Sequence, residues 1–326
     1  MNERVAIILA AGQSTRMNTK TAKVLHEVCG RPMLEWVLDA CREAGVQKHI
    51  VVVGYGKDQI IERYKDAGDV EFVEQAEQKG TGHAVMCCRE QLAGFTGQTL
   101  ILCGDAPLIR TETLKVLIEK HEHEKSAVTL ATAVMSDPTG YGRIVRDGYG
   151  NIEGIVEHND CDEKQLAITE INPGYFCFQT PFLLEALDKI TPNNVKNEYY
   201  LTDALHLLIA DGRKATAVTA VVAEDAMGVN NRQQLSLVGK IMQQRIQERL
   251  MGAVVTIVDP PNTCIDARAE VGQDAVIQPF TCISGAVKIG DNCRVGPFAY
   301  LYEGADVPAG SVVGVFEKLS KGMLKC

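Results

Sequence analysis

Short apolar runs alternate with stretches of helical periodicity through the first part of the chain. The apolar runs have the length of buried strands, and they occupy residues 5–9, 49–53, 70–73, 99–103 and 127–134. Between them, apolar positions recur at helical spacing in residues 32–44, 57–66, 81–92 and 111–124. Strands that alternate with helices are typical of a parallel sheet with helices on both faces. The pattern therefore predicts an α/β fold with a doubly wound parallel sheet.

The pattern changes in residues 140–178, where shorter β-like runs are separated by glycines and turns. We interpret this stretch as an inserted region that folds over the sheet edge and covers a cleft. Residues 181–188 and 201–210 are again helical in pattern, and residues 215–222 have the character of a strand. Residues 231–251 keep apolar positions at helical spacing throughout, which predicts a long connecting helix.

A six-residue repeat fills the last part of the chain. The position two residues before each aliphatic residue of the repeat is nearly always small. Hexads of this kind are typical of a parallel β-helix, whereas an antiparallel sheet would give a period of two. Nine hexads make about three coils if each coil takes three of them. The aliphatic positions are Ile265, Val271, Ile277, Ile283, Ile289, Val295, Leu301, Val307 and Val313.

These patterns divide the 326 residues into three parts. We expect an α/β domain in residues 1–230, a linker helix in residues 231–251 and a short left-handed β-helix in residues 252–326. A net charge of −9 argues against a nucleic-acid partner. An anionic small substrate would then need a local basic pocket and a divalent cation.

The cysteines and the hydropathy suggest a cytoplasmic protein. The eleven cysteines are odd in number, scattered, and without zinc-type spacing, so we expect a reducing compartment and no structural disulfides. The first apolar run is too short for a signal peptide. No stretch approaches the roughly 20 apolar residues of a membrane span, so we expect no membrane association.

The loop after the first apolar run has the character of a phosphate site. Small residues, Ala10-Ala11-Gly12, let the backbone come close to an anion, and Arg16 and Lys23 follow as two cations. A strand that ends in such a turn is how open α/β sheets bind phosphate. The alternative is an ordinary flexible loop with two solvated cations.

Three further groups have candidate chemistry. Asp105 follows the fourth apolar run, where a carboxylate beside a phosphate loop suits Mg²⁺, although it can also cap a turn. Gln75 and Gln78 precede a Gly-Thr-Gly turn, and their side-chain amides could hydrogen-bond to the edge of a nucleotide base. An ordinary turn before a helix would explain the same residues. Glu157 and Asn172 could bind sugar hydroxyls or could be solvated surface residues.

Residues 9–23 read LAAG-x3-R-M-x5-K, which resembles the signature of sugar-nucleotide pyrophosphorylases. The chain is more similar still to the bacterial family of bifunctional N-acetylglucosamine-1-phosphate uridylyltransferases/glucosamine-1-phosphate acetyltransferases. The resemblance runs from the N-terminus into the hexads. Its segments are KVLHEVCGRPML (23–34), EQAEQKGTGHA (74–84), GDAPL (104–108), DPTGYGRIVR (137–146), GIVEH (154–158), EINPG (170–174), EYYLTD (198–203) and GVNNRQQL (228–235).

The resemblance implies a Rossmann-like nucleotidyltransferase domain and a role for each matching residue. Arg16 and Lys23 would be catalytic, acting on the phosphates, and Asp105 and Asn230 would bind Mg²⁺. The sugar phosphate would contact Gly142, Glu157, Asn172 and Thr202. The nucleotide would be held by Leu9, Ala10, Ala11, Gly12, Gln75, Gln78, Gly80, Thr81, Cys103 and Gly104.

The implied reaction transfers UMP from UTP to N-acetylglucosamine 1-phosphate, which serves cell-wall synthesis. The family trimerises through its β-helix, so a homotrimer is implied as well. Alternatives are a related enzyme for glucose 1-phosphate or dTTP, or a catalytically silent assembly subunit. Retention of Arg16, Lys23, Asp105 and Asn230 together argues against a silent subunit.

Three departures from the family pattern stand out. Cys103 replaces the usual tyrosine before Gly-Asp, and Ala22 replaces the usual proline before the lysine. The chain ends soon after the ninth hexad, and Tyr302 stands where the family has an acetyl-site arginine. We therefore expect no acetyltransferase activity.

Overall fold

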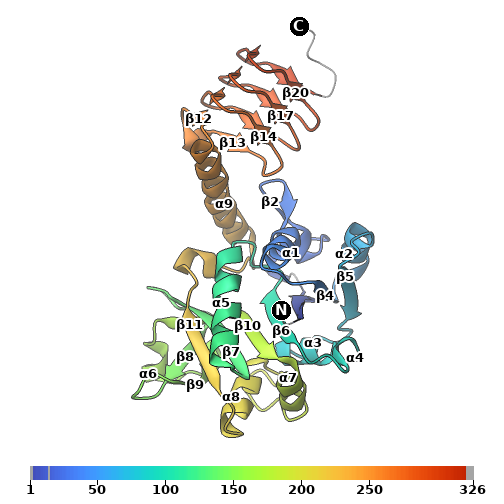
Figure 1. Cartoon of the computed structure of the whole chain (residues 1–326), viewed down its shortest axis with the longest axis vertical. Helices are drawn as coiled ribbons and strands as arrows, with labels where there is room; N and C mark the ends of the chain where they lie inside the picture. Colours follow the sequence, from blue (N-terminus) through green and yellow to red (C-terminus); the bar gives the residue numbers. More distant parts are fainter. Residues whose placement is uncertain (1–2, 14, 321–326) are drawn as a thin grey trace. The chain divides into compact units, whose positions relative to one another are not determined.

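The computed structural model describes residues 3–13 and 15–320 (Figure 1). The chain divides into two compact units. Residues 1–26 and 33–232 form the first unit, and residues 27–32 and 233–326 form the second. Residues 321–326 of the predicted β-helix lie outside the described residues.

A mixed β-sheet forms the centre of the first unit. Strand β1 (Arg4–Ala10) is an inner strand and pairs in parallel with β4 (Lys48–Val53) on one side and β6 (Gln98–Cys103) on the other. Their carboxyl ends therefore share one edge of the sheet, where the loop after β1 begins. In sheet order the strands are β11 (Ala215–Thr219), β7 (Val128–Val134), β10 (Glu170–Gln179), β6 (Gln98–Cys103), β1 (Arg4–Ala10), β4 (Lys48–Val53) and β5 (Val70–Glu74).

Helices cover both faces of this sheet, as the alternating pattern predicts. Ile8 of β1 belongs to one core with Leu34 and Leu117, whereas Ile7 belongs to the opposite core with Leu205. The α-helices of the unit are α1 (Met33–Glu43), α2 (Lys57–Tyr64), α3 (Thr81–Met86), α4 (Arg89–Leu92), α5 (Thr111–Glu124), α6 (Glu163–Leu166), α7 (Thr180–Leu187) and α8 (Thr202–Ala210). The 3-10 helices are η1 (Thr15–Met17), η2 (Lys23–Leu25), η3 (His158–Asp160) and η4 (Ala223–Ala226).

The α/β fold is confirmed, but the sheet is mixed, and the assignment of all of residues 140–178 to an insertion over the sheet edge is wrong. Strand β10 comes from the stretch that we assigned to an edge insertion, yet it lies between β6 and β7 and runs antiparallel to both. The reason is its alternating burial: Tyr175 and Cys177 pack in one core, and Phe176 and Phe178 in the other. A strand that is apolar on both faces suits a place inside a sheet that helices cover on both sides.

The remainder of the predicted insertion is a small hairpin. Strands β8 (Gly142–Arg146) and β9 (Ile152–Val156) pair with each other, and β8 also pairs with the start of β10. The hairpin therefore extends the sheet rather than standing apart from it. The helix predicted over residues 81–92 is also divided in two, because the helical pattern breaks at Cys87 and Cys88 between α3 and α4.

The second unit contains the short left-handed parallel β-helix predicted from the hexads. Its strands stack in parallel and in register, so that Ile265 lies beside Ile283 and Ile283 beside Leu301. These aliphatic side chains are buried, as expected. The strands are β12 (Thr256–Ile257), β13 (Cys264–Ile265), β14 (Glu270–Val271), β15 (Val276–Ile277), β16 (Cys282–Ile283), β17 (Lys288–Ile289), β18 (Arg294–Val295), β19 (Tyr300–Leu301), β20 (Asp306–Val307), β21 (Val312–Val313) and β22 (Lys318–Leu319).

Helix α9 (Arg232–Gly252) belongs to the second unit and covers the first coil of the β-helix. The side-chain amide of Gln243 donates to Ile265 O at 3.1 Å and accepts from Ile265 N at 3.0 Å, as a neighbouring strand would. Gln247 donates to the carbonyls of Pro260 and Thr263 at 2.9 and 2.8 Å. The helix thus satisfies backbone groups that an open sheet edge would leave free. The unit also contains β2 (Glu27–Val28), β3 (Arg31–Pro32) and η5 (Pro260–Asn262).

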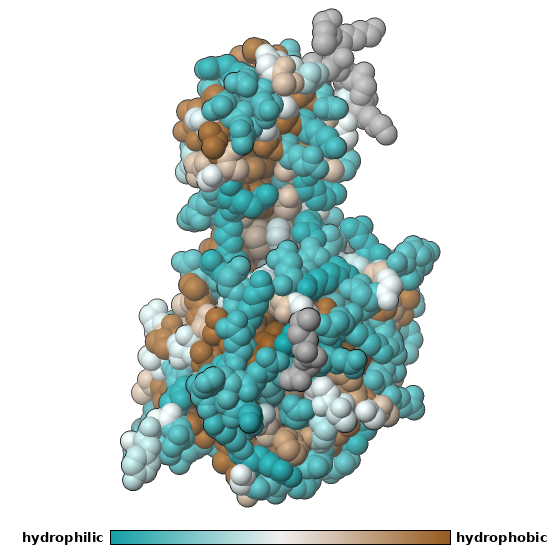
Figure 2. Space-filling view, in the orientation of Figure 1, coloured by the Kyte–Doolittle hydropathy of each residue, from teal (hydrophilic) through white to brown (hydrophobic). Residues whose placement is uncertain are grey.

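Most of the surface drawn in Figure 2 is hydrophilic, with hydrophobic side chains in scattered patches. Within residues 3–13 and 15–320, no helix is long and apolar enough to cross a membrane. The cysteines of the described residues all carry free thiols.

Candidate active site

A pocket of about 270 Å³ opens at the carboxyl end of strand β1. It brings together the loop after β1, the glutamine loop after β5 and the end of β6. Most of the residues that we expected to bind nucleotide line it, together with the catalytic candidate Lys23 and the metal candidate Asp105. The lining residues are Leu9, Ala10, Ala11, Gly12, Lys23, Val24, Gln75, Gln78, Gly80, Thr81, Ala84, Cys103, Asp105 and Glu198.

Small residues are required where the loop after β1 meets its neighbours. A side chain on Gly54 would place its Cβ 2.7 Å from Ala11 O and 2.9 Å from Gln78 Nε2. A side chain on Gly104 would crowd Leu9 O, and Gly104 N donates to this same oxygen at 3.0 Å. The glycines thus bring three segments into backbone contact, which is the close approach that phosphate loops need.

Lys23 holds the centre of the polar cluster in the pocket. Its Nζ forms an ion pair with Asp105 Oδ2 and donates to Asn230 Oδ1 at 3.2 Å. Arg16 Nη2 donates to the same Asn230 oxygen at 3.0 Å. The side chains of Lys23 and Asp105 are only 16% and 18% exposed, so solvent screens their attraction less than at an open surface. The two cations and the two metal candidates predicted from the sequence therefore form one cluster.

Gln59 on helix α2 supports the cation loop. Its Oε1 accepts from Ala22 N at 3.1 Å, and its Nε2 donates to Lys20 O at 2.9 Å. Ala22 is buried and would meet any side chain placed on Gly56 at 2.9 Å. Sequence reasoning missed Gln59, because a polar residue on a helix resembles any other solvated position.

Two tyrosines anchor the segment that carries Asn230. Tyr175 Oη donates to Asp225 O at 3.2 Å, and Tyr141 Oη donates to Ala226 O at 3.3 Å. Further along, Val229 N donates to Asp105 O at 2.9 Å. Asn230 is thereby tied to the strand end that carries Asp105. Sequence reasoning missed both tyrosines, which look like ordinary core residues.

The glutamine loop is held mainly by its own hydrogen bonds. Gln75 Nε2 donates to Gly80 O at 3.0 Å and lies 3.1 Å from His83 Nδ1. Gln78 Nε2 donates to Gln75 O at 3.3 Å. Thr81 Oγ1 accepts from Leu201 N at 3.1 Å, which ties the loop to the start of α8. The buried Gln75 therefore shapes the loop, and Gln78 lies at its exposed rim.

The four residues expected to contact the sugar phosphate meet in a second cluster. Thr202 Oγ1 donates to Glu157 Oε1 at 3.2 Å, and a Cβ on Gly142 would lie 3.5 Å from Glu157 Oε2. Asn172 pairs with Gly142 across strands β10 and β8, and its Oδ1 accepts from Gly174 N at 2.9 Å. The four candidates thus come from four elements of the fold, but they share one place.

Cys103 joins the two clusters. A Cβ on Gly174 would lie 3.2 Å from Cys103 Sγ, and Cys103 also lines the pocket with Asp105. Burial raises the pKa of Cys103 to about 12, with a smaller contribution from Asp105, so its thiol is neutral and unreactive. Burial likewise raises the pKa of Glu157, against the hydrogen bond from Thr202. A carboxyl that is desolvated beside a polar pocket is typical of a binding site.

The candidate metal ligands are the oxygen atoms of Asp105, which lines this pocket, and of Asn230, which is not among the lining residues but reaches the same Lys23 ammonium. Both contact the same Lys23 ammonium, so they lie close enough to share one cation. Carboxylate and amide oxygens suit a hard ion such as Mg²⁺. Within the described part of the chain, no group of three or more His, Cys, Asp and Glu residues could hold a metal. A divalent ion would therefore take its other ligands from bound phosphates and water.

Comparisons with known proteins find matches for both parts of the chain. Residues 6–162 match the MobA-like NTP transferase domain, and residues 268–303 match the bacterial transferase hexapeptide (six repeats). The chain is 45% identical to the bifunctional protein GlmU of Listeria monocytogenes serotype 4b over 279 residues, which is 86% of this chain and 61% of the relative. It is 46% identical to the bifunctional protein GlmU of Geobacillus sp. (strain WCH70), over 86% of this chain and 60% of the relative.

The chain thus spans about three fifths of the length of these curated relatives. A solved structure of UDP-glucose pyrophosphorylase complexed with UDP-glucose matches with a TM-score of 0.61. That match covers 75% of this chain and 100% of the other at 17% identity, so it supports the fold alone. The chain is therefore a homologue of the GlmU proteins over the matched 279 residues, and it contains a MobA-like NTP transferase domain followed by bacterial transferase hexapeptide repeats.

Proposed function

We propose that the protein transfers UMP from UTP to N-acetylglucosamine 1-phosphate and releases pyrophosphate. This proposal rests on one observation: Arg16, Lys23, Asp105 and Asn230 form a single polar cluster beside the loop after β1. A cluster of two cations, a carboxylate and an amide oxygen beside a small-residue loop suits a triphosphate with a divalent ion. The 45% identity to GlmU proteins supports the choice of substrates.

The nucleotide would lie in the pocket between the loop after β1 and the glutamine loop. Backbone N–H groups at Ala11 and Gly12 would face the phosphates, and Arg16 and Lys23 would neutralise them. The amide of Gln78 could bond the uracil edge, while Gln75 keeps the loop in shape through Gly80 and His83. Gly104 supports the nucleotide pocket through its bond to Leu9 O.

The sugar phosphate would bind in the second cluster. The Glu157 carboxyl and the Asn172 amide offer acceptors and donors for the sugar hydroxyls and the acetamido group. Thr202 fixes Glu157 by its 3.2 Å hydrogen bond. Gly142 is required for packing beside Glu157, because a Cβ there would lie 2.8 Å from Ile155 Cγ2.

The reaction would be an in-line displacement at the α-phosphorus of UTP. One oxygen of the sugar phosphate attacks, the bond to the β-phosphate breaks, and pyrophosphate leaves. Because the attacking oxygen is already anionic, no general base is required. The protein then contributes alignment of the two substrates and neutralisation of charge by Arg16 and Lys23. A Mg²⁺ ion, held by Asp105 and Asn230, would supply further charge neutralisation on the phosphates.

The proposal assigns this activity to residues 1–230, with residues 231–251 as a linker and residues 252–326 as a β-helix that forms a homotrimer. The expected lack of acetyl transfer stays a prediction, supported by Tyr302 at the position of an expected arginine. A measurement of acetyl transfer from acetyl-coenzyme A to glucosamine 1-phosphate tests it, and clear turnover would contradict it.

A ³¹P nuclear magnetic resonance experiment tests the proposed reaction. The protein is mixed with Mg²⁺, UTP and N-acetylglucosamine 1-phosphate, and the phosphorus signals are followed. We expect signals of pyrophosphate and a UDP-sugar to grow together in equal amounts. Growth of orthophosphate alone would indicate hydrolysis, and unchanged spectra would indicate a silent subunit; either result would overturn the proposal.

A further inference from the structure

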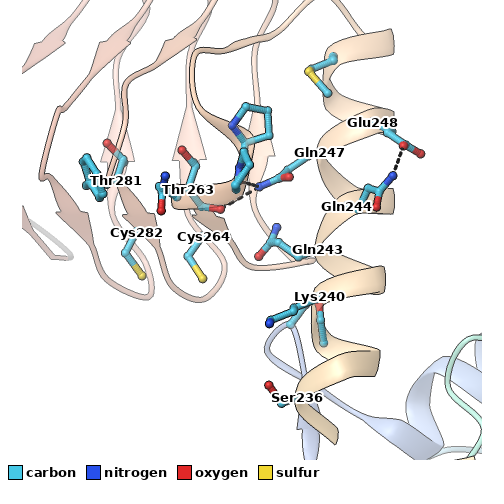
Figure 3. Close-up of a pocket in the computed structure, with 17 residues that line it drawn as sticks. Ser236, Lys240, Gln243, Gln244, Gln247, Glu248, Thr263, Cys264, Thr281 and Cys282 are labelled. Carbon is cyan, nitrogen blue, oxygen red and sulfur yellow. Dashed lines mark hydrogen bonds between the residues drawn. The ribbon is translucent and has the colours of Figure 1, made fainter. Parts of the chain in front are cut away.

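Three cysteines line a groove in the second unit. The groove has a volume of about 1120 Å³. The groove lies between helix α9 and the first coils of the β-helix (Figure 3). Cys29 comes from the turn between β2 and β3, Cys264 from strand β13 and Cys282 from strand β16. None of the three belongs to the nucleotide pocket of the first unit. Their chemistry is therefore not explained by the proposed nucleotidyl transfer.

Cys264 and Cys282 are direct neighbours in the parallel ladder. Strands β13 and β16 pair in register, with Cys264 opposite Cys282. Neighbouring strands lie about 4.8 Å apart, which is within the roughly 4.4–6.8 Å that joins the Cα atoms of a disulfide. Both side chains point outward, because the residues that follow them are the buried Ile265 and Ile283. Figure 3 shows the two sulfur atoms side by side and pointing in the same direction.

The environment makes one thiol of this pair reactive. Cys264 is exposed, and the hydrogen bond from the Cys282 thiol lowers the pKa of Cys264 to about 6. The same contact and burial raise the pKa of Cys282, which is half-buried, and the two thiols titrate as a pair. A thiolate is the form of cysteine that attacks an oxidant. Cys264 is thus suited to attack, and Cys282 to resolve the product.

Cys29 lines the same groove but differs in chemistry. Its Sγ lies 3.5 Å from Gly239 O and donates to that carbonyl. Burial raises its pKa to about 12, with smaller contributions from Cys264 and Asp266. Cys29 therefore stays a neutral thiol and serves as a matched control.

We propose that Cys264 and Cys282 are a peroxide-reactive pair that closes to a disulfide between adjacent coils of the β-helix. The Cys264 thiolate attacks the terminal oxygen of a hydroperoxide, the O–O bond breaks, and a sulfenic acid forms. The departing hydroxide or alkoxide takes a proton from solvent and leaves as water or an alcohol. Cys282 Sγ then attacks the Cys264 sulfur, the S–O bond breaks, and a second water leaves with the Cys282 proton. The two thiols lose two electrons to the peroxide, so the sequence is balanced.

The expected bond is easily reversed. In-register parallel neighbours hold their Cβ atoms near the strand spacing, whereas a relaxed disulfide brings them to about 3.8 Å. The strands must tilt toward each other at this pair when the bond forms. A strained and exposed disulfide is reduced more readily than a structural one. The pair would therefore form a disulfide when peroxide is present, and the disulfide would be reduced again in a reducing compartment.

Peptide mapping of the full chain tests the proposal. Trypsin cleaves after Arg268 and Lys288, so Cys264 and Cys282 fall on different peptides. The reduced protein is treated with hydrogen peroxide, the remaining thiols are alkylated, and the digest is analysed by mass spectrometry without reduction. We expect the two peptides joined with the loss of two hydrogens, and their separation after dithiothreitol.

Variants distinguish the roles of the three thiols. In Cys282→Ser, peroxide should leave a sulfenic acid on Cys264 that dimedone traps, because no resolving thiol remains. In Cys29→Ser, the link between Cys264 and Cys282 should form as in the unaltered protein. Dimedone on Cys264 of the unaltered protein without the link, a link through Cys29, or unmodified thiols at both positions would overturn the proposal.

Discussion

The ammonium group of Lys23 joins Asp105 and Asn230, although these residues are far apart in the chain. Its Nζ forms an ion pair with Asp105 Oδ2 and donates to Asn230 Oδ1 at 3.2 Å. The three side chains come from η2, from the end of β6 and from the segment that precedes α9. The sheet order places β1 beside β6, and this brings the loop after β1 to Asp105. One cation therefore occupies the two oxygen atoms that would hold a metal.

Loss of the Asp105 charge should stop catalysis without unfolding the protein. Asp105→Asn keeps the side-chain size but removes the anion that would bind Mg²⁺. We expect kcat for pyrophosphate release to fall by about 10²–10³-fold, the range for losing one group that stabilises charge. The matched control is Asp188→Asn, which breaks the exposed pair with Arg89 and should keep full activity. Equal rates for Asp105→Asn and the unaltered protein would refute the metal assignment.

Removal of the Lys23 charge should strengthen metal binding in the absence of nucleotide. Lys23 holds both candidate ligand oxygens, so Lys23→Met frees them and removes a repelling charge. We expect the affinity for Mn²⁺, measured by electron paramagnetic resonance, to rise about tenfold, which corresponds to ~1.4 kcal/mol. The rate of nucleotidyl transfer should fall at the same time. Unchanged or weaker Mn²⁺ binding would show that Lys23 and the metal do not share these oxygens.

The site was partly predictable from the sequence. Arg16, Lys23 and Asp105 follow strands or lie on the loop after β1, so strand ends place them at one edge. Asn230 could not be placed in this way, because Tyr141 and Tyr175 bring its segment to Asp105. Such tertiary hydrogen bonds leave no periodic signal in the sequence.

The Glu157 carboxyl should make stability depend on pH. Burial raises the pKa of Glu157 in the folded protein, so the native state binds this proton more tightly than the unfolded state. The stability that the neutral Glu157 carboxyl contributes is therefore lost as the pH rises from the ordinary pKa of a glutamate to the raised pKa of Glu157. Glu157→Gln is neutral throughout, so its melting temperature relative to the unaltered protein should rise over that window. Parallel curves between pH 4 and pH 8 would contradict a raised pKa.

The same Glu157→Gln substitution should weaken sugar binding. The amide oxygen can still accept from Thr202, whereas one acceptor for the sugar becomes a donor. We expect KM for the sugar 1-phosphate to rise more than kcat falls, with KM for UTP unchanged. A larger KM for UTP alone would show that Glu157 faces the nucleotide instead.

Ala22 makes a backbone hydrogen bond that a proline at this position could not make. Its φ of −55° lies in the range of proline, but its N–H donates to Gln59 Oε1 at 3.1 Å. Ala22→Pro should gain about 0.4–1 kcal/mol from chain entropy and lose about 0.5–1.5 kcal/mol of hydrogen bonding, so its net effect should be small. In a Gln59→Ala background there is no bond to lose, and the proline should stabilise. Urea unfolding of the four proteins measures this, and identical effects in both backgrounds would disprove the coupling.

Two glutamines on α9 should differ in their contribution to stability. Gln247 is buried and donates to Pro260 O and Thr263 O, whereas Gln244 is exposed and donates to Glu248 within the helix. Gln247→Ala leaves two carbonyls without this donor and should lower the free energy of unfolding by about 1–3 kcal/mol. Gln244→Ala should change it by less than about 0.5 kcal/mol. Equal losses in chemical denaturation would show that α9 does not cap the β-helix through Gln247.

The fold was more predictable than its topology. The hexads predicted the interior of the β-helix, because the one aliphatic side chain of each short strand can be buried only there. Ile277, Val295 and Val313 are buried as expected. The position of β10 was not predictable, because a strand of ten residues reads the same whether it runs parallel or antiparallel. Its pairing with both β6 and β7 is decided by packing on two faces.

The central claim is that the cluster around Lys23 and Asp105 transfers UMP to N-acetylglucosamine 1-phosphate. The most direct measurement is the rate of pyrophosphate release with Mg²⁺ across UTP, dTTP and other nucleoside triphosphates, each with N-acetylglucosamine 1-phosphate or glucose 1-phosphate. The account predicts the highest kcat/KM for UTP with N-acetylglucosamine 1-phosphate and its loss in Asp105→Asn. Absence of turnover with every pair, or a preference for dTTP or glucose 1-phosphate, would contradict it.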